Sequence, residues 1–319
     1  MTSAKPLMLS LNAMATRFEI VLGGAEASRL RAAGEEALEE IASLDRQLSF
    51  YNPDSDVSRI NARAGREPVR IEPRLFQLLQ TASDLSRATD GAFDITVAPL
   101  MRAWGLAGGE GSVPSECEIE EAGLRVGAEL VHLDEERCAV SFERDGVQID
   151  LGAIGKGYAI DRAVETLRDN GVTSALIHGG TSTIYALGTA PDGRPWRVAI
   201  RYPRRETEPA LGRDPLMLGC DLESHPEQNR ELDLHDCSLS VSAIHGKSFM
   251  RDGREYGHVI DPRCGLPTQA AALAAVWGPS ATVTDALSTA LLVLGEPGVG
   301  LLCDGYQGLT LIDSRPDAG

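Results

Sequence analysis

Positive charge is scarce in this chain, and so are long apolar stretches. Lys and Arg together number 30 against 47 Asp and Glu, which leaves a formal net charge of −17. So strong a negative balance argues against a broad basic face that holds a nucleic acid. No stretch of roughly eighteen or more uninterrupted apolar residues occurs, so we expect no helix that spans a membrane.

Cysteine is also sparse, and its spacing argues against two kinds of site. The 6 cysteines are scattered and no CxxC pair occurs, which disfavours both a zinc ribbon and a disulfide framework. The beginning of the chain, MTSAKPLMLSLNAMATRF, shows no charged segment followed by the long apolar core of a leader peptide. We therefore expect a reduced, cytoplasmic protein.

Lysine occurs only at Lys5, Lys156 and Lys247, so arginine is the usual cation of this chain. Lys156 lies in a glycine-rich segment, where a compact ammonium differs in chemistry from the planar guanidinium of arginine. The choice of lysine there points to a chemical role.

The apolar pattern predicts helices and strands without strict alternation, which is typical of an α+β fold. We expect helices over 25–47, around 75–85, around 160–169 with a stop at Asn170-Gly171, and over 284–294. Strands are expected at 16–22, 130–133, 139–142, 174–177, 185–187, 196–202, 239–241, 256–260 and 272–277. A further strand is expected to begin at Ile149 and to lead into the glycine turn. The chain is predicted to be a single domain, 1–319, with surface insertions around 204–215 and in the acidic run 221–236.

The segment IDLGAIGKGYAID, residues 149–161, is the densest concentration of glycine and charge. It is not a P-loop, because glycine rather than Ser or Thr follows Lys156, and it lacks the third glycine of the dinucleotide fingerprint. What remains is Asp150 at a strand end, a backbone turn and an ammonium at a helix N-terminus, a combination able to meet a metal or a phosphate. The alternative is a tight strand-to-helix connection in which glycine only relieves crowding.

The segment TVTDALSTALLVLG places Asp285 and Thr289 four residues apart, on one face of the predicted helix. A carboxylate and a hydroxyl are hard oxygen ligands of the kind that Mg²⁺ takes. The alternative is that both residues cap the start of the helix.

Two further segments carry candidate residues. His258 precedes Asp261-Pro262 at the expected end of a strand, where an imidazole is able to act as a base or to bind phosphate. His178, beside Gly179-Gly180, is its only rival among the histidines. The segment Gly91-Ala92-Phe93-Asp94 suits a turn whose backbone holds a polar ring edge, or a turn with a capping Asp.

These segments, in this order, resemble the ApbE family of flavin transferases. The match runs through MATRFEIVL, LSFYNPDSDVSRINARAG, TDGAFDITVAPLMRAWGL, IDLGAIGKGYAIDRAVETLRDNGV, HVIDPRCGLP and TDALSTALLVLG, and covers nearly the whole chain apart from the two insertions. The resemblance implies mixed sheets with packed helices in two intimately associated lobes. It also implies an Mg²⁺-dependent transferase that moves FMN from FAD onto a Ser or Thr of an acceptor flavoprotein and releases AMP.

The family pattern also implies roles for particular residues. The implied FAD contacts are Met14, Tyr51, Ala92, Phe93, Asp94, Asp150, Lys156 and His258. The implied magnesium ligands are Asp285, Thr289 and the backbone carbonyl of Ala153. His258 resembles the histidine of the transfer step, and Asp161 matches an acid to which we assign no role.

The chain departs from the family pattern at two places. Thr181 follows Gly179-Gly180, where relatives usually carry Asp, and Val241-Ser242-Ala243 stands where they usually read Thr-Ser-Gly. Two other functions therefore stay open from the sequence. One is an FAD pyrophosphatase that releases FMN and AMP, and the other is a non-catalytic FAD-binding protein.

Overall fold

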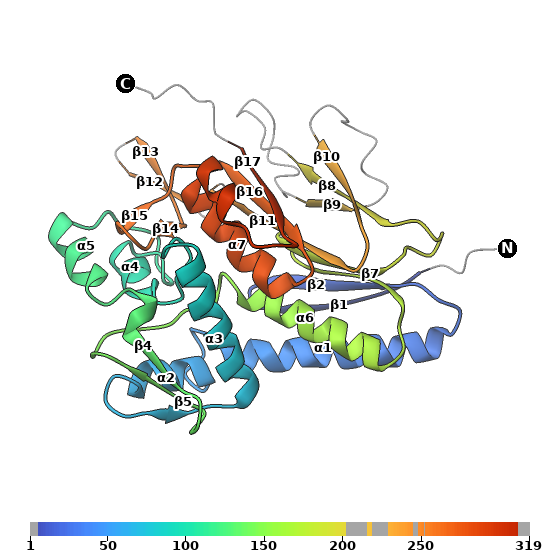
Figure 1. Ribbon diagram of the computed structural model, residues 1–319, viewed down its shortest axis with the longest axis horizontal. Coiled ribbons are helices and arrows are strands. Elements are labelled where there is room, and N and C mark those ends of the chain that lie inside the picture. Colours follow the sequence, from blue (N-terminus) through green and yellow to red (C-terminus); the bar gives the residue numbers. More distant parts are fainter. Residues whose placement is uncertain (1–5, 202–215, 219–228, 245–247, 252, 312–319) are drawn as a thin grey trace.

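A seven-stranded antiparallel sheet lies at the centre of the structure (Figure 1). The computed structural model describes residues 6–201, 216–218, 229–244, 248–251 and 253–311. The strand order in the sheet is β1-β2-β6-β7-β11-β16-β17. Its strands are β1 (Leu7–Ala13), β2 (Thr16–Leu22), β6 (Ser174–Gly179), β7 (Thr183–Gly188), β11 (Cys237–Ala243), β16 (Leu273–Gly278) and β17 (Gln307–Leu311).

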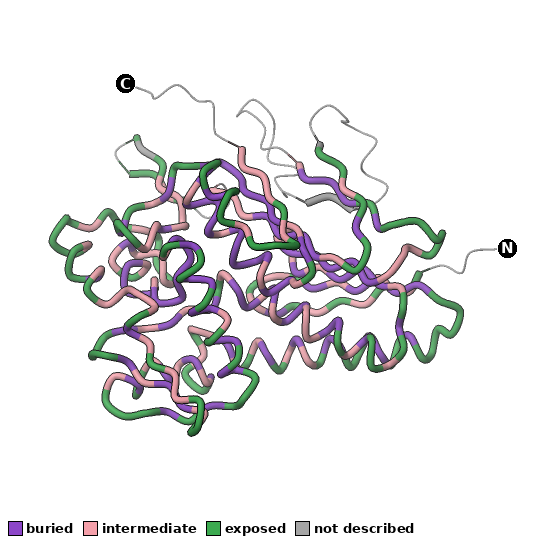
Figure 2. The backbone as a smooth tube through the Cα atoms, viewed as in Figure 1, coloured by how far each residue is buried: buried purple, intermediate pink, exposed green. Residues whose placement is uncertain are grey.

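Both faces of the central strands are buried, because helices cover one face and a second sheet covers the other (Figures 1 and 2). In β6, Ala175 and Ile177 pack with the helices, whereas Leu176 packs with the second sheet, as the alternation of side chains along a strand requires. The helical layer comprises α1 (Ala27–Leu48), α6 (Gly155–Asp169) and α7 (Ala281–Leu294). The second sheet has the order β10 (Asn229–Leu234), β8 (Trp196–Arg201), β9 (Leu216–Leu218).

The remaining elements extend the helical side of the molecule. A three-stranded sheet has the order β3 (Val69–Arg70), β5 (Ala139–Phe142), β4 (Val131–Asp134). The other helices among the described residues are α2 (Asp56–Arg63), α3 (Pro73–Ala88), α4 (Ala98–Ala103), α5 (Glu116–Gly123) and the short 3₁₀ helices Ala128–Leu130 and Glu296–Leu301. Two hairpins join β12 (Ser248–Arg251) to β13 (Arg254–Gly257), and β14 (Ile260–Asp261) to β15 (Leu266–Pro267). None of the described helices is long and apolar enough to cross a membrane.

The α+β prediction is confirmed, and the elements with the longest apolar patterns lie where they were expected. β2 covers the predicted strand 16–22, and α1 covers most of the predicted helix 25–47. α6 ends at Asp169, directly before Asn170-Gly171. Gly171 has a φ of 74°, a conformation that favours glycine and stops the helix.

The predicted strand from Ile149 into the glycine turn is wrong. The residues before α6 are irregular, and their backbone is satisfied by a side chain in place of a neighbouring strand. The Asn61 amide donates to the Ile149 carbonyl at 2.9 Å and accepts from the Ile149 N–H at 2.8 Å. An apolar run that an amide side chain pairs in this way needs no β-ladder.

Three other predictions need correction. Part of the acidic run 221–236 is strand β10, whose Leu234 is buried against the second sheet, while 221–228 and the other insertion, 204–215, lie outside the described residues. The predicted strand 256–260 is interrupted, since the β12–β13 ladder ends at Gly257 and His258 lies in the bend that follows. α7 begins at Ala281, three residues before the predicted start.

Candidate metal and flavin site

Serines on the helix-facing side of β11 form one wall of the site. They alternate with Leu239 and Val241, which pack against the second sheet. Ser238 and Ser240 each place their hydroxyl 2.9 Å from that of Thr284 on α7. Further along the strand, the Ser242 Oγ lies 2.9 Å from the Ser288 Oγ and 3.3 Å from the Thr289 Oγ1. Hydroxyl pairs therefore connect β11 to the residues that flank Asp285.

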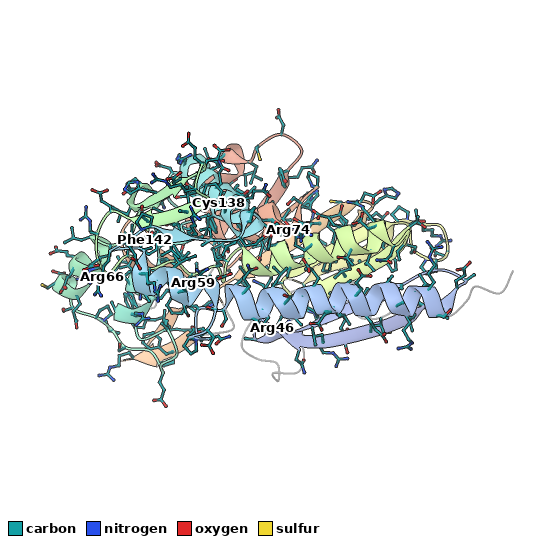
Figure 3. The ribbon with its side chains drawn as sticks, turned by 90° about the horizontal axis from the view of Figure 1, so that it is seen from below. Arg46, Arg59, Arg66, Arg74, Cys138 and Phe142 are labelled. Atoms are coloured by element: carbon teal, nitrogen blue, oxygen red, sulfur yellow. The ribbon has the colours of Figure 1, made fainter. Side chains whose placement is uncertain are left out.

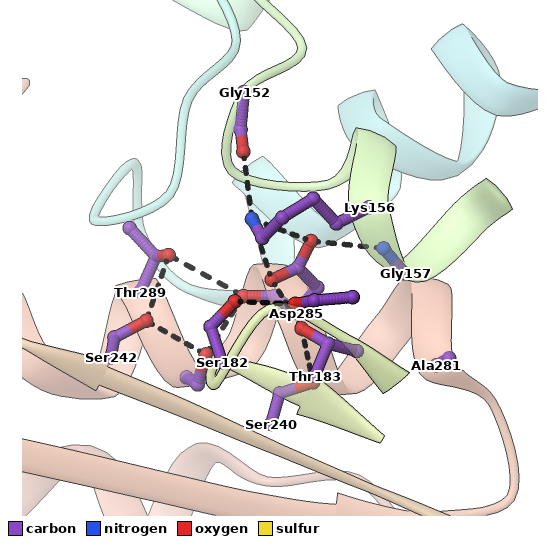
Figure 4. Close-up of polar contacts among 12 residues, drawn as sticks. Gly152, Lys156, Gly157, Ser182, Thr183, Ser240, Ser242, Ala281, Asp285 and Thr289 are labelled. Carbon is purple, nitrogen blue, oxygen red and sulfur yellow. Dashed lines mark hydrogen bonds and ion pairs between the residues drawn. The ribbon is translucent and has the colours of Figure 1, made fainter. Parts of the chain in front are cut away.

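Asp285 is the buried carboxylate of this site, with only 4% of its surface exposed (Figure 4). Its Oδ1 accepts a hydrogen bond from the Thr183 hydroxyl at 3.1 Å, and its Oδ2 accepts one from the Gly157 N–H at 3.0 Å. Ser280 is the N-cap of α7, so Asp285 is not a cap. A buried carboxylate that is aimed at the start of α6 is suited to hold a positive charge there.

Lys156 supplies such a charge. Its Nζ lies 3.4 Å from Asp285 and donates to the Gly152 carbonyl at 3.2 Å (Figure 4). The two partners of this contact, Lys156 and Asp285, are 129 residues apart in the sequence. A carboxylate and a backbone carbonyl thus converge on one small cation.

The oxygen donors around this point are of the chemical types that Mg²⁺ takes. Asp285 offers a carboxylate and Thr289, one turn later, offers a hydroxyl, while Ala153 lies in the turn next to Gly152. In the described part of the chain, no three His, Cys, Asp or Glu side chains gather into a metal cluster. Mg²⁺ nevertheless needs few protein ligands, because it keeps several waters and shares the phosphates of its substrate.

Gly157 lets α6 and α7 approach closely. A Cβ at this position would lie 2.0 Å from the Ala281 carbonyl oxygen and 2.8 Å from the Asp285 Cβ. Only glycine fits here without a shift of one helix.

We expect Gly157→Ala to destabilise the fold by about 1–3 kcal/mol or more, since overpacked interiors cost that much. It should also weaken every function that depends on Asp285. Gly155→Ala, on the same helix, is the matched control, because a Cβ at Gly155 would meet no atom closer than 4.0 Å. Urea unfolding of both variants measures the difference, and equal stabilities would contradict the close approach.

Tyr51 and Asp150 interact at the start of the glycine segment. Burial raises the pKa of the Asp150 carboxyl. The hydrogen bond from the Gly152 N–H and the charge of Lys156 lower this pKa, but the effect of burial is larger. The pKa of the Tyr51 phenol is raised mainly by partial burial and, to a smaller extent, by the negative charge of Asp150. The Tyr51 side chain still exposes 68% of its surface. The two residues therefore share one partly open region with Lys156.

The segment Ala92–Asp94 joins this region through its backbone. Ala92, Phe93 and Asp94 are buried, and Asp94 accepts hydrogen bonds from Ser86 and from both the N–H and the hydroxyl of Thr96. The Asp150 N–H donates to the Ile95 carbonyl at 2.7 Å, which holds the segment beside the glycine turn. Little of the surface of these three residues is exposed, their backbone included.

Met14 lies in the two-residue turn between β1 and β2. Met14 and Ala15 have φ values of 49° and 57°, in the left-handed region that non-glycine residues seldom adopt. The Met14 N–H donates to Asp45 on α1 at 2.9 Å, which supports this conformation. A two-residue hairpin turn of this kind requires positive φ at both central residues.

The two candidate histidines lie in different environments. His258 is half-buried between β13 and β14, and a Cβ built on its neighbour Gly257 would lie 3.6 Å from the carbonyl oxygen of Ile244, two residues beyond Ser242. Its segment is thus placed beside the Ser242 end of the site. His178 instead places its ring nitrogens 2.9 Å from the Gly180 carbonyl and 3.1 Å from Glu19.

A polar cavity of about 430 Å³ lies between α1, α3 and α6, and none of the candidate residues lines it. Figure 3 looks onto this side of the molecule, where Arg46 and Arg74 are labelled near α1. The charged side chains that line the cavity largely form ion pairs: Glu40 pairs with Arg74 and Arg162, and Asp56 pairs with Arg59. The cavity therefore offers no concentration of one charge.

Sequence reasoning missed two partners of the candidate residues. Thr183 bonds Asp285, and Ser242 bonds Thr289. The one available signal was the alternation of serine with apolar residues over 238–242, which marks a strand with a polar face inside the core. Nothing in the local sequence around Thr183 points to Asp285.

Comparison with known protein families shows to which family the chain belongs. The model of the ApbE family matches residues 14–310. The chain belongs to the ApbE family. Among curated relatives, the FAD:protein FMN transferase of Treponema pallidum is 30% identical over 88% of this chain and 77% of its own length.

Solved structures of ApbE proteins share this fold. The ApbE protein of Thermotoga maritima is 28% identical and superposes with a TM-score of 0.81, covering 96% of this chain and 94% of its own. The apo form of the flavinyl transferase ApbE of Pseudomonas stutzeri is also 28% identical, with a TM-score of 0.78 over 98% and 96% of the two chains. The ApbE resemblance predicted from the motifs is confirmed.

Proposed function

We propose that this chain transfers FMN from FAD to a Ser or Thr hydroxyl of an acceptor flavoprotein in an Mg²⁺-dependent reaction that releases AMP. Its membership in a family whose curated members are named FAD:protein FMN transferase supports the reaction class. The observation that carries the proposal for this chain is the convergence of Asp285 and the Gly152 carbonyl on the Lys156 ammonium.

Each residue of the site has a task in this reaction. Lys156 meets the pyrophosphate of FAD as a point charge, beside the N-terminus of α6. Asp285, Thr289 and the Ala153 carbonyl hold Mg²⁺, and Thr183 and the Gly157 N–H orient the Asp285 carboxylate. Bound there, Mg²⁺ supplies charge neutralisation for the pyrophosphate as AMP leaves.

The flavin end of the substrate lies toward Tyr51, Met14 and the backbone of Ala92–Asp94, with Asp150 between this end and Lys156. His258 accepts the proton of the acceptor hydroxyl as its oxygen attacks the phosphorus on the FMN side. The new P–O bond joins FMN to the acceptor, and the P–O bond to AMP breaks. The products are a flavinylated protein and AMP.

One assay separates this function from the two alternatives. The protein is incubated with FAD and Mg²⁺, with and without an FMN-binding acceptor domain, and AMP and fluorescent protein bands are measured. A labelled acceptor band with AMP supports the transferase. AMP without an acceptor identifies a pyrophosphatase, and bound intact FAD identifies a binding protein, so either result overturns the proposal.

We expect Tyr51→Ala to weaken FAD binding several-fold, because an aromatic contact contributes about 0.5–1.5 kcal/mol beyond its buried area. Tyr51→Phe keeps the ring and should retain most of the affinity. Both are measured by FAD titration without Mg²⁺. Wild-type affinity in Tyr51→Ala would place the flavin elsewhere.

A further inference from the structure

The Asp161 carboxylate contacts α7 from the neighbouring helix α6. Its Oδ1 accepts from the Ala281 N–H at 2.8 Å, and its Oδ2 accepts from the Ser280 hydroxyl at 2.7 Å, the Thr282 N–H at 2.8 Å and the Thr282 hydroxyl at 2.6 Å. Both oxygens are thus used on the first turn of α7. The carboxylate also lies where the helix dipole favours a negative charge.

This contact is additional to the ordinary cap of α7. The Ser280 side chain already accepts from the Val283 N–H at 3.3 Å, as the N-cap of the helix. Asp161 instead joins two different helices. It lies one turn beyond Gly157 on α6, so both residues face α7.

The two contacts together define how α7 sits on α6. Gly157 approaches the Ala281 carbonyl and donates to Asp285, while Asp161 binds the N–H of the same Ala281. Lys156 belongs to α6, whereas Asp285 and Thr289 belong to α7. A slide of α7 along α6 would separate the Lys156 ammonium from the carboxylate it contacts.

We propose that Asp161 is a positioning residue of the metal site: it fixes the register of α7 on α6 and so holds Asp285 and Thr289 opposite Lys156. The inference rests on the proposed function, because it takes Asp285 and Thr289 as the magnesium ligands. Asp161 itself touches neither metal nor substrate, and it acts through the helix that carries the ligands.

Asp161→Asn is the sharpest variant for a test. Asparagine has nearly the same shape and keeps one acceptor oxygen, but its NH₂ group cannot accept from the N–H that it faces, whether that of Ala281 or that of Thr282, and the negative charge is lost. Changes in residues that orient metal ligands typically reduce metal affinity by about 10- to 100-fold. We expect the Kd for Mg²⁺ to rise roughly tenfold, the low end of that range.

Calorimetric titration of the FAD-free protein with Mg²⁺ measures this effect without relying on turnover. FMN transfer by Asp161→Asn should also need more Mg²⁺ for half-maximal rate, with a saturated rate near that of the wild type. Ser115→Ala is the matched control, since it removes the capping box of α5, away from the site. We expect both Ser115→Ala and Asp161→Asn to lower the melting temperature by a few degrees, and Ser115→Ala to leave the Mg²⁺ affinity unchanged.

The outcomes distinguish the inference from the function on which it rests. If Asp161→Asn loses thermal stability like Ser115→Ala and binds Mg²⁺ within twofold of the wild type, Asp161 is a structural cap only and the inference is wrong. If Asp285→Asn also binds Mg²⁺ like the wild type, the metal site lies elsewhere and the proposed function needs revision.

Discussion

Asp285→Asn is expected to abolish Mg²⁺-dependent FMN transfer while the protein stays folded. Asparagine keeps one oxygen that accepts from the Gly157 N–H, and its NH₂ group can donate to the Thr183 hydroxyl oxygen, so both contacts that hold the side chain have a counterpart in the variant. The charge that holds the metal is lost. Because a bound metal contributes several kcal/mol to such a reaction, and about 1.4 kcal/mol is tenfold in rate, we expect a fall of roughly a hundred- to a thousandfold or more.

Rates over a range of Mg²⁺ concentrations, together with a calorimetric Mg²⁺ titration, check this expectation. Asp84→Asn is a suitable control, since Asp84 is a surface carboxylate paired with Arg87 on α3. It removes the same charge at a distance from the site and should leave both measurements unchanged. A wild-type Mg²⁺ dependence in Asp285→Asn would refute the ligand assignment.

His258→Ala is expected to bind FAD nearly normally and yet transfer little FMN. A general base contributes about a hundred- to ten-thousandfold to the rate, whereas loss of one phosphate contact mainly weakens affinity. The expected result is therefore a fall in kcat of that size with a much smaller change in the Kd for FAD. Single-turnover flavinylation of an acceptor domain and FAD titration measure the two quantities separately.

His178→Ala provides the internal control for this experiment. The His178 ring is held by the Gly180 carbonyl and Glu19, so its removal tests the loss of a structural histidine. We expect near wild-type transfer in this variant. If His178→Ala loses transfer while His258→Ala keeps it, the turn that carries Thr181 holds the chemistry and the mechanism proposed above is wrong.

Several features followed from local patterns alone. The amphipathic period over 25–47 predicted α1, the alternation over 16–22 predicted β2, and Asn170-Gly171 marked the end of α6. The four-residue spacing of Asp285 and Thr289 also places them one turn apart on α7. These features depend on neighbours within a few residues, and their periods and stop signals are visible in the sequence.

Other local predictions failed because distant groups compete for the same backbone. The Asn61 side chain replaces a strand partner at Ile149, so an apolar run that reads as a strand stays irregular. α7 starts earlier than its apolar pattern suggests, because Ser280 and Asp161 satisfy its first N–H groups. Asp161 is 119 residues from Ser280, so no window of local sequence contains both partners.

The candidate residues could be predicted from their sequence motifs, but their arrangement in space depends on packing between distant parts of the fold. The Lys156–Asp285 contact joins residues 129 apart, and Thr183 reaches Asp285 from 102 residues away. Both contacts exist because the helical layer packs on the central sheet, with Gly157 allowing α7 to lie close to α6. Periodicity determines which face of an element is apolar, whereas the register between two packed helices is set by the side chains that meet there, here Gly157 and Asp161.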